Sequence, residues 1–353
     1  MKYVAIGCLL LALFARPAFA QERVLTTVST LAGTAGSKGS ADGAGAAARF
    51  NFPHSIAVAA TGVVYVADMN NHTIRKITPD GVVSTLTGLA GQKGSADGSG
   101  AAARFRSPAG LAVDADGTIY VADAGNHTIR RISPAGVVMT LAGTAGSKGS
   151  ADGSRQNARF NFPHALAIGR NGMLYVADTY SHTIRVIKPT GEVTTLAPSA
   201  GHKGHADGAG PLASFFHPSG LAVDAQGTLY VANNGNHTIR RVMADGTVTT
   251  LAGQAGHRGS ADGQGSAALF DVPASLAVAA DGNLYVADYF NSTIRRITEQ
   301  GQVTTLAGAP RGWRSLDGQL LDARFDFPFG VAVGHNGWVY VAESGGNTVR
   351  VIR

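Results

Sequence analysis

The chain has 353 residues and a formal net charge of +6, with 47 glycines and only 15% charged residues. Its single cysteine, Cys8, lies near the N-terminus, so the rest of the chain can form no disulfide, thiol nucleophile or cysteine metal site. Basic residues are spread along the sequence without forming a run. A mild positive charge without a basic patch predicts no nucleic-acid partner.

Residues 1–20 have the features of a secretory signal peptide. Lys2 precedes an apolar run at 4–14, and "AFA" forms a small-x-small pattern just before Gln21. An apolar run of about eleven residues is too short to span a bilayer of roughly 30 Å. We therefore expect an exported protein, periplasmic or extracellular. Its mature part should have no transmembrane segment and carry 27 basic and 23 acidic residues.

From residue 21 onward the sequence repeats itself every 55 residues. The segment "LYVADTYSHTIRVI" at 174–187 returns in six versions, and its tyrosine shows the spacing. This tyrosine is Tyr65, Tyr120, Tyr175, Tyr230, Tyr285 and Tyr340. A fixed period of this length indicates a repeat architecture. Six periods fill residues 21–353, so we expect one domain there.

Each period contains four short strand patterns, illustrated by the second repeat. Residues 111–117 alternate apolar with small or polar residues before a turn, and residues 118–123 form the hairpin partner. Two further strand patterns follow at 127–132 and 137–143, separated by the turn "SPAG". The segment 43–50 predicts about one or two helical turns. The fold class predicted is all-β, a six-bladed β-propeller of four-stranded antiparallel blades.

The ends of the repeated region predict how the ring closes. If the strands of a blade are named a to d from the tunnel outward, residues 28–33 form a d-type strand and residues 348–353 a c-type strand. The last blade lacks a d strand, and the N-terminal segment supplies one. Pairing the two removes two exposed sheet edges. We therefore predict that the last blade is closed by the N-terminal strand.

The repeat pattern "P.GLAVD..G.LYVAD..NHTIRRI", together with "VTTLAG", resembles the NHL repeat. The resemblance covers all six repeats and implies a six-bladed β-propeller. It implies no single function, because NHL propellers include protein- and RNA-binding modules, extracellular sensor domains and a few lyases.

Six copies of one unit separate shared architecture from features of a single blade, and we expect three recurring charged series to be structural. They are Asp42, Asp97, Asp152, Asp207, Asp262 and Asp317; Asp68, Asp123, Asp178, Asn233, Asp288 and Glu343; and Arg75, Arg130, Arg185, Arg240, Arg295 and Arg350. We expect these groups to pair with neighbouring blades or to cap turns. The histidines of "NHTIR" are expected to form blade-to-blade hydrogen bonds; they are His72, His127, His182 and His237.

Two histidines break the repeat at the mouth of the expected tunnel. The long d-to-a inserts and the b-to-c connections share one face of the disk, called the insert face below. There the residue after each repeat proline rims the tunnel, in the order His54, Ala109, His164, Ser219, Ala274 and Phe329. Loops on one face of a rigid scaffold commonly carry binding residues. His54 and His164 are therefore candidate ligand-binding and catalytic residues.

The same two histidines raise the question of a metal. They lie two blades apart, about 120° around a six-bladed ring. This layout resembles the amidating-lyase members of the family, which hold zinc with tunnel histidines on alternate blades, but the third alternate position here is Ala274. A catalytic zinc takes three protein ligands, so we predict no cofactor, with zinc or calcium at His54 and His164 as the alternative. The repeated aspartates do not follow the pattern of a calcium loop.

Further residues break the repeat on the insert face. In the b-to-c connections they are Tyr180, Tyr289 and Phe290. Just before the repeat prolines they are Arg106, His217 and Asp271, and the last insert adds Arg311, Trp313 and Arg314. Exposed aromatic residues with arginine suit a binding surface, although the same side chains could instead pack the inserts together. The predicted ligand-binding set is His54, His164, Tyr180, His217, Tyr289, Phe290, Arg106 and Trp313.

Two functions from different classes fit this pattern. The first is a non-catalytic binding module, a monomer that binds a protein, peptide or glycan on the insert face, because no nucleophile, base and orienting group stand apart from the repeats. The second is an enzyme of the tunnel mouth, a lyase or lactone hydrolase that uses His54 and His164 as acid and base or as metal ligands. With only four glutamates in the chain, a lactonase that needs several carboxylates on a metal is disfavoured. We favour the binding module.

Overall fold

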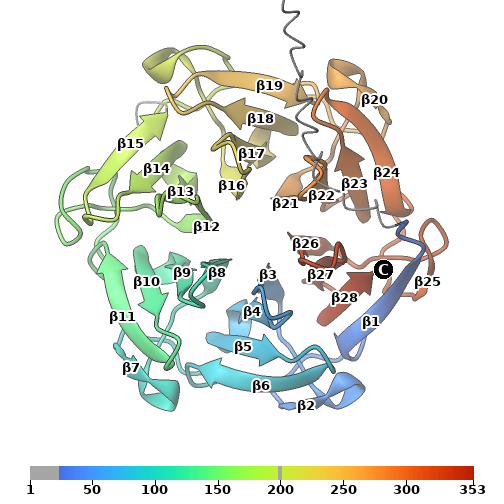
Figure 1. The fold of residues 1–353 in the computed structure, drawn as a ribbon, viewed down its shortest axis with the longest axis horizontal. Helices are drawn as coiled ribbons and strands as arrows, with labels where there is room; N and C mark the ends of the chain where they lie inside the picture. The colour runs from blue at the N-terminus through green and yellow to red at the C-terminus, as the bar shows by residue number, and fades with distance from the viewer. Residues whose placement is uncertain (1–23, 198–200) are drawn as a thin grey trace, which may run out of the picture.

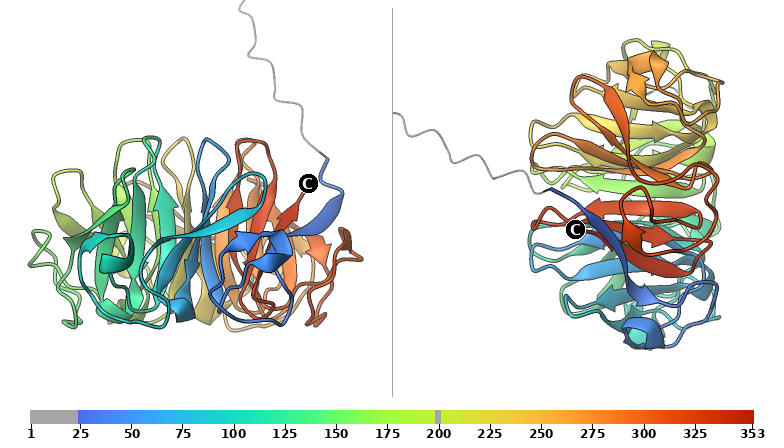
Figure 2. Two further views of the ribbon diagram at one scale, coloured as in Figure 1. Left: turned by 90° about the horizontal axis from the view of Figure 1, so that it is seen from below. Right: turned by 90° about the vertical axis from the view of Figure 1, so that its right-hand side faces the viewer.

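The structure is a computed structural model and describes residues 24–197 and 201–353. Six antiparallel sheets surround a central axis as the blades of a propeller (Figure 1). Side views show a disk whose strands are joined by loops on both faces (Figure 2). The predicted signal peptide, residues 1–20, lies outside the described residues. The predicted fold class, an all-β six-bladed propeller, is confirmed.

The four main strands of each blade are given below in their order from the axis outward. The first blade has β3 (Pro53–Val58), β4 (Val64–Asp68), β5 (Thr73–Ile77) and β6 (Val82–Thr87). The second has β8 (Pro108–Val113), β9 (Ile119–Asp123), β10 (Thr128–Ile132) and β11 (Val137–Ala142). The third has β12 (Pro163–Ile168), β13 (Leu174–Asp178), β14 (Thr183–Ile187) and β15 (Val193–Ala197).

The other three blades repeat this order. The fourth has β16 (Pro218–Val223), β17 (Leu229–Asn233), β18 (Thr238–Val242) and β19 (Val248–Ala252). The fifth has β21 (Pro273–Val278), β22 (Leu284–Asp288), β23 (Thr293–Ile297) and β24 (Gln302–Gly308). The sixth has β26 (Pro328–Val333), β27 (Val339–Glu343), β28 (Thr348–Ile352) and β1 (Thr27–Gly33).

Each insert also touches the outer edge of the blade that it leads into. In four blades this contact is a fifth strand of two residues, namely β2 (Gly43–Ala44), β7 (Gly98–Ser99), β20 (Gly263–Gln264) and β25 (Gly318–Gln319). In the third and fourth blades it is a single bridge, Gly153 to Val193 and Gly208 to Val248. The sequence predicted only four strands, because two extended residues in a glycine-rich insert have no alternating pattern.

Short 3₁₀ turns occur in the inserts and in the connections between the second and third strands. Those in the inserts are η1 (Gly45–Ala47), η3 (Gly100–Ala102), η6 (Gly210–Leu212) and η8 (Gly265–Ala267). Those between the second and third strands are η2 (Met69–Asn71), η4 (Ala124–Asn126), η5 (Thr179–Ser181) and η7 (Asn234–Asn236). The innermost strand of the second blade begins at Pro108, three residues before the predicted start at 111, because a proline at the first strand position disrupts no ladder bond.

The two ends of the described chain complete the sixth blade together. Strand β1 pairs antiparallel with β28, with Val28 opposite Ile352 and Ala32 opposite Val349. The backbone amides of Thr26 and Thr27 both donate to the carbonyl of Arg353 at 2.9 Å. In Figure 1 the blue strand β1 lies beside the red strand β28. The predicted closure of the last blade by the N-terminal strand is confirmed.

The hydrophobic core lies between neighbouring blades. Around the first blade, Phe50, Val66 and Ile77 pack with Tyr340 and Val349 of the sixth. Each insert contributes one fully buried phenylalanine, in the series Phe50, Phe105, Phe160, Phe215, Phe270 and Phe325. Each blade therefore buries its apolar residues against the next, as expected for a closed repeat fold. No helix in the two described ranges is long or apolar enough to cross a membrane.

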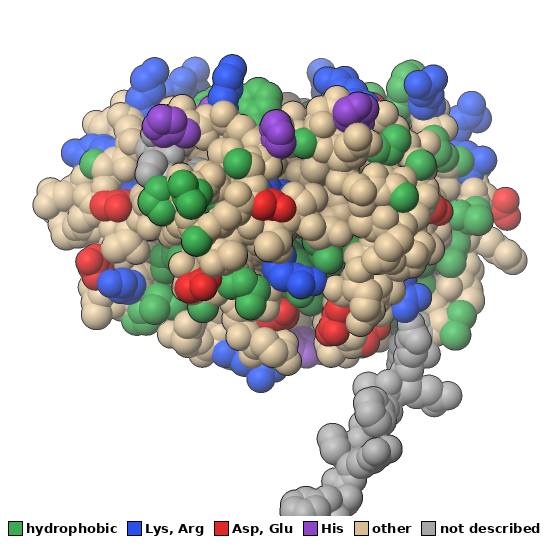
Figure 3. All heavy atoms as spheres, turned by 90° about the horizontal axis from the view of Figure 1, so that it is seen from above, with side chains coloured by type: hydrophobic (Ala, Val, Ile, Leu, Met, Phe, Trp, Pro, Cys, Tyr) green, Lys and Arg blue, Asp and Glu red, His purple; other side chains and the backbone are tan. Residues whose placement is uncertain are grey.

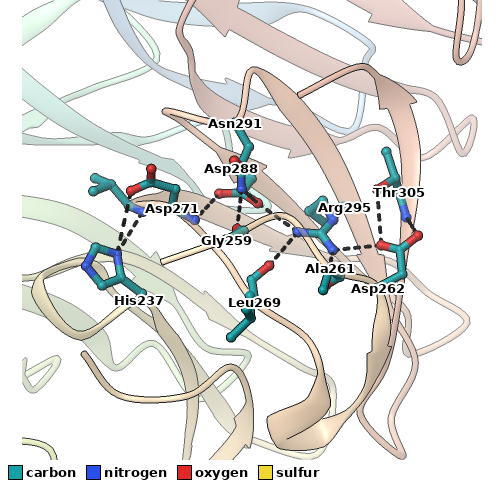
Figure 4. Close-up of polar contacts among 11 residues, drawn as sticks. His237, Gly259, Ala261, Asp262, Leu269, Asp271, Asp288, Asn291, Arg295 and Thr305 are labelled. Carbon is teal, nitrogen blue, oxygen red and sulfur yellow. Dashed lines mark hydrogen bonds and ion pairs between the residues drawn. The ribbon is translucent and has the colours of Figure 1, made fainter. Parts of the chain in front are cut away.

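A buried arginine fixes each insert to the blade that follows it, as the fifth blade shows (Figure 4). The Arg295 guanidinium donates to Asp288 at 2.8 Å and to Asp262 at 2.7 Å. It also donates to the carbonyls of Ala261 and Leu269, at 2.9 Å each. Arg295 is 0% exposed, so its charge requires local acceptors. Three of these four acceptors belong to the insert, so the pairing stays within one blade and its insert and does not reach the neighbouring blade.

The fourth and sixth blades show which part of this network is indispensable. Arg240 of the fourth blade faces Asn233 where other blades have a carboxylate, yet it keeps Asp207 at 2.6 Å. In the sixth blade Glu343 takes the carboxylate position and pairs with Arg350 at 2.8 Å. The bond between the arginine and the insert therefore recurs even where the buried carboxylate is replaced by an amide.

The histidines of "NHTIR" connect neighbouring blades. Nδ1 of His72 accepts a hydrogen bond from the Ser107 amide, and Nδ1 of His237 accepts one from the Val272 amide at 3.0 Å. His127 and His182 accept equivalent bonds from the following insert. All four residues have a positive φ near 60°, a conformation in which histidine, like asparagine and aspartate, is enriched among non-glycine residues. The predicted blade-to-blade role is confirmed.

We predict that deleting residues 24–33 opens the ring. The deletion exposes the edge of β28 and removes Val28 and Ala32 from the core, so the midpoint of thermal unfolding should fall by at least ~10 °C and edge-to-edge association should follow. Calorimetry and light scattering test both effects. As a control, a circular permutant with residue 353 joined to residue 24 and new ends in the turn at 134–135 should associate no more than the wild type and melt near it. Equal loss in both proteins would contradict the closure argument.

We predict unequal costs within the arginine network. Arg295→Met leaves Asp288 buried without its cation and should lower the free energy of unfolding by roughly 3–5 kcal/mol, while Asp288→Asn should cost less than half of this. The milder effect is expected because Asp288→Asn reproduces the natural fourth blade. Burial also raises the pKa of Asp288 to about 6, against the opposing effect of Arg295. Chemical denaturation at pH 7 measures both variants, and equal losses would refute this ranking.

Candidate functional site

The residue after each repeat proline is directed toward the axis by a break in strand register. In the first blade Pro53 pairs with Asp68 and Ser55 with Ala67, so His54 between them is the extra residue of a bulge. The same irregularity surrounds His164 in β12 and Phe329 in β26. A bulge reorients a side chain at the end of a strand. The repeat therefore provides the direction, and the residue type at this position provides the chemistry.

Hydrogen bonds join this rim from blade to blade. The His54 ring bonds through Nδ1 to the carbonyl of Ala109 at 2.9 Å, and the His164 ring bonds through Nδ1 to the carbonyl of Ser219 at 3.1 Å. The hydroxyl of Ser219 donates to the carbonyl of Ala274 at 2.9 Å. In each case the acceptor is the equivalent residue of the next blade. The rim is therefore a pre-organised part of the scaffold.

These bonds determine the tautomer of both histidines. A carbonyl oxygen only accepts, so Nδ1 carries the proton and Nε2 keeps a free lone pair in the neutral ring. Burial, followed by the neighbouring His164, holds the pKa of His54 well below its ordinary value. Burial also lowers the pKa of His164. Both imidazoles are therefore neutral at pH 7.

Three rings meet across the tunnel mouth. The His54 ring lies 4.5 Å from the His164 ring in an edge-on arrangement and 3.8 Å from the Phe329 ring, measured between ring centroids. His164 and Phe329 are 5.5 Å apart. His54 is only 3% exposed, whereas His164 and Phe329 are partly exposed. A ligand at the mouth therefore meets His164 and Phe329 first.

Aromatic rings continue from this centre in both directions. On one side Phe329 contacts Tyr289 at 5.3 Å, Tyr289 contacts Phe327 at 5.1 Å, and Trp313 stacks on Phe327 at 6.2 Å. Phe290 packs against Tyr289 at 4.9 Å. These residues extend the centre as far as the last insert.

The other side extends toward the fourth blade. His164 lies 6.2 Å from Phe162, Tyr180 stacks on Phe162 at 5.0 Å, and His217 lies 5.4 Å from Tyr180. We call the whole series the aromatic row; its members are Trp313, Phe290, Phe327, Tyr289, Phe329, His54, His164, Phe162, Tyr180 and His217. Tyr180 and Trp313 are 52% and 56% exposed, so the row presents large rings to solvent at both ends.

The structure brings together seven of the eight predicted site residues. Arg106 is the exception. It is exposed on the second blade, and its side chain lies against the b-to-c connection at Gly125. Its positive charge there helps to lower the pKa of His72 and of His127.

Two members of the row, Phe162 and Phe327, were not predicted. Both directly precede a repeat proline and have positive φ values of 57° and 51°. A proline normally pushes the preceding residue into extended backbone, so the local sequence predicts a different orientation for these two side chains. One signal was available, since phenylalanine at this position accompanies the rim residues His54, His164 and Phe329 in the first, third and sixth blades.

The fold gathers basic residues that are dispersed in the sequence. One exposed basic residue of each of five inserts lies on the insert face, in the series Lys38, Lys93, Lys148, Lys203 and Arg258. Figure 3 views the disk from the side and shows Lys, Arg and His side chains along its upper border. Lys93, Lys148, Lys203 and Arg258 each lower the pKa of a nearby "NHTIR" histidine. Basic residues that form no run in the sequence therefore share one face of the folded protein, because each of five inserts contributes one of them.

The donors at the mouth do not fit a catalytic zinc. Nδ1 of both histidines is occupied by a carbonyl, which leaves two Nε2 atoms, and the third alternate position is Ala274. Within residues 24–197 and 201–353 no three His, Cys, Asp or Glu side chains are grouped for a metal. A catalytic zinc needs three protein ligands. The two histidines therefore offer one ligand too few for such a zinc.

The fold and the repeats define a class of protein, a six-bladed β-propeller. A family model for the NHL repeat matches residues 50–77, 105–132, 160–187 and 215–242. The chain therefore belongs to the NHL-repeat family. It is 29% identical over 320 residues to Protein SUPPRESSOR OF QUENCHING 1 of Arabidopsis thaliana, which covers 85% of this chain and 30% of the relative. It is 29% identical over 326 residues to NHL repeat-containing protein 2 of Bos taurus, covering 81% of this chain and 44% of the relative.

This chain thus spans less than half the length of those two relatives. Among solved structures, it is similar to an auxiliary nutrient binding protein from Bacteroides ovatus, with TM-score 0.69, 19% identity and coverage of 94% and 77% of the two chains. It is also similar to a virginiamycin B lyase from Staphylococcus aureus, with TM-score 0.55, 16% identity and coverage of 86% of this chain and 95% of the lyase. A gluconolactonase from Xanthomonas campestris matches with TM-score 0.59, 16% identity and coverage of 93% of this chain and 89% of that enzyme. At these identities the likeness supports the fold alone.

We predict that His54 and His164 stay neutral, protonated on Nδ1, from pH 8 to below the ordinary histidine pKa near 6.5. Since the folded state disfavours their charged forms, the stability linked to them is complete above that value and is lost as the pH falls below it. An imidazole ¹H–¹⁵N titration, assigned with His54→Gln and His164→Gln, measures the tautomer and the midpoint of protonation of each ring. A short histidine peptide with the ordinary pKa near 6.5 is the reference. A His54 midpoint at or above that value would contradict the buried, neutral assignment.

Proposed function

We propose that this protein is an exported binding module, periplasmic or extracellular, which recognises a protein, peptide or glycan on its insert face. The observation that carries the proposal is the aromatic row, a continuous series of rings running through the tunnel mouth and exposed at both ends. Large aromatic side chains provide contact area at a small cost in conformational entropy. The rim below is fixed by hydrogen bonds between blades, so little ordering is needed on binding.

The charge of the insert face indicates what kind of ligand it selects. Lys38, Lys93 and Lys148 form no ion pair with another described residue, while Arg258 lies 3.8 Å from Asp271. A ring of cations around an apolar centre attracts an acidic partner and speeds its encounter. We therefore propose an acidic protein segment or acidic glycan as the ligand. The expectation of no nucleic-acid partner remains a prediction, and the binding test includes it.

We predict that immobilised polyglutamate or polygalacturonate binds the protein, and that binding weakens with salt. Tyr180→Ala and Trp313→Ala should each weaken it about tenfold, as expected for exposed aromatic anchors. The double variant Lys93→Glu with Lys148→Glu should remove most of the salt-sensitive part of the binding. The matched controls are Met139→Ala and Lys76→Glu, which lie on β11 and β5 away from the row. Neutral dextran and a single-stranded oligonucleotide complete the set. Binding that survives the face variants, or prefers the oligonucleotide, would contradict the proposal.

A second candidate, an enzyme of the tunnel mouth, is favoured by one observation. The Nε2 atoms of His54 and His164 are unprotonated and lie on two rings in contact, so either could act as a general base for a lyase or lactone hydrolase. Similarity in fold to a lyase and a gluconolactonase is consistent with this candidate. The depth of His54 beneath Phe329 counts against it, because substrate would have to displace that ring.

Metal content separates the two candidates. We expect the purified protein to contain less than one equivalent of metal by mass spectrometry, with no change in His54→Ala or His164→Ala. Stoichiometric metal that is lost in both variants would overturn the binding module in favour of a metalloenzyme.

A further inference from the structure

The face opposite the inserts contains a second departure from the repeat. Three cations of the third blade, Arg155, Arg170 and Lys188, stand where most other blades have small or neutral residues. The counterparts of Arg155 are Gly45, Gly100, Gly210, Gly265 and Leu320. Those of Arg170 are Ala60, Ala115, Ala225, Ala280 and His335. Those of Lys188 are Thr78, Ser133, Met243, Thr298 and Arg353.

The structure collects these three residues in one cavity. It has a volume of about 770 Å³, lies between the second and third blades, and is also lined by Arg131 of β10. Arg155 lies in the third insert, where the 3₁₀ turn found in four other inserts is missing, and its side chain crosses Gly191. A Cβ placed on Gly191 would lie 2.0 Å from Nε of Arg155.

The floor of the cavity is apolar. It is formed by Tyr120 and Leu141 of the second blade and by Leu174 and Ile187 of the third. All four belong to the hydrophobic cluster between these blades or pack against it. The cavity is thus the open end of a blade-to-blade core, roofed by charged side chains. Its size is within the range of small-molecule sites, which are typically ~300–1,000 Å³.

Three of the four cations in this cavity lack a direct ion pair. Arg131, Arg155 and Arg170 form no ion pair with any other residue that the structure describes. Lys188 pairs with exposed Glu192 at 2.7 Å.

Two carboxylates also line the cavity, Asp114 and Asp116, but they are engaged in the β8–β9 turn. Both carboxylates accept a hydrogen bond from the backbone amide of Thr118, Asp114 at 3.0 Å and Asp116 at 2.8 Å. Asp224 of the fourth blade accepts the equivalent amide of Thr228, so the bond to Asp114 is part of the repeat. Arg131 has a similar local partner, because it lies 3.4 Å from the Thr118 hydroxyl and its charge helps to lower the pKa of Asp116. Arg155 and Arg170 have no such partner among the described residues, which leaves their positive charge above an apolar floor.

The other crevices between blades serve as internal controls. Between the fourth and fifth blades, the four equivalent positions are Arg241, Gly265, Ala280 and Thr298, and Arg241 donates to the Glu299 carbonyl at 2.8 Å. No other crevice carries more than two arginines or lysines at these positions. The four-cation arrangement is therefore not a requirement of the propeller.

We propose that this cavity, which we call the blade 2–3 site, binds a small organic anion. A carboxylate or phosphate head group binds to Arg155, Arg170 and Lys188, and an apolar body lies on Tyr120, Leu141, Leu174 and Ile187. Arginine presents parallel donors that match the oxygens of either head group, and the apolar floor adds burial that a bare inorganic ion cannot use. The site lies on the face opposite the aromatic row and is independent of the ligand proposed there.

Calorimetric titration of the intact protein with benzoate and phenyl phosphate tests the proposal, and comparison of the two shows which head group is preferred. At least one should bind saturably at millimolar concentrations or below, and inorganic phosphate and benzyl alcohol should bind more weakly. Arg170→Ala and Arg155→Gly, which restore the residues of other blades, should each weaken binding about tenfold, the size of one lost charge-assisted hydrogen bond.

Arg241→Ala, the equivalent of Arg131 in the crevice between blades 4 and 5, is the matched control and should leave affinity unchanged. Thermal unfolding establishes that each variant is folded. Absence of saturable binding by both aromatic anions would overturn the proposal. Equal affinity for inorganic phosphate and phenyl phosphate would do the same, as would binding that Arg155→Gly and Arg170→Ala leave intact. Tyr180→Ala should not affect this site, so failure here is distinguishable from failure of the function proposed for the insert face.

Discussion

The buried arginine of each blade is the constraint on which the rest of this propeller depends. A guanidinium keeps its charge in a protein, so each of the six copies must find acceptors inside the fold. Most of those acceptors belong to the insert, which is thereby fixed along its blade in spite of its many glycines. The insert ends at the proline that begins the innermost strand. The side chains of the tunnel mouth are therefore positioned by the segment that the arginine holds.

Function in this molecule resides in departures from the repeat. Identical blades would surround the axis with identical rims, and such a ring offers a ligand no preferred orientation. Here His54, His164 and Phe329 occupy three of six equivalent bulges and come into contact, whereas Ala109 and Ala274 carry only a methyl group at this position. On the opposite face Arg155, Arg170 and Lys188 replace small residues in the same way. The scaffold supplies precise positions, and single substitutions in one blade convert them into sites.

Much of the site could be predicted because the repeat converts sequence distance into angle around a ring. A step of 55 residues placed His54 and His164 on one rim, and the break in register then brought their rings to 4.5 Å. Phe162 and Phe327 were missed because their positive φ depends on the turn into the proline and contradicts the local preference. The basic ring was missed for another reason. Lys38, Lys93 and Lys148 are 55 residues apart in sequence and share a face only because each blade places its insert there.

The sequence by itself determined the number of blades, their four main strands, the closure by the N-terminal strand and the position of the rim, since all of these follow from a strict period and a strand-length pattern. Only the tertiary structure decided which charges pair within a blade, how the aromatic rings form a row and where uncompensated cations collect over an apolar floor. The physical reason is that periodicity specifies backbone placement, whereas pairing, stacking and burial depend on side chains from different repeats meeting across blade boundaries.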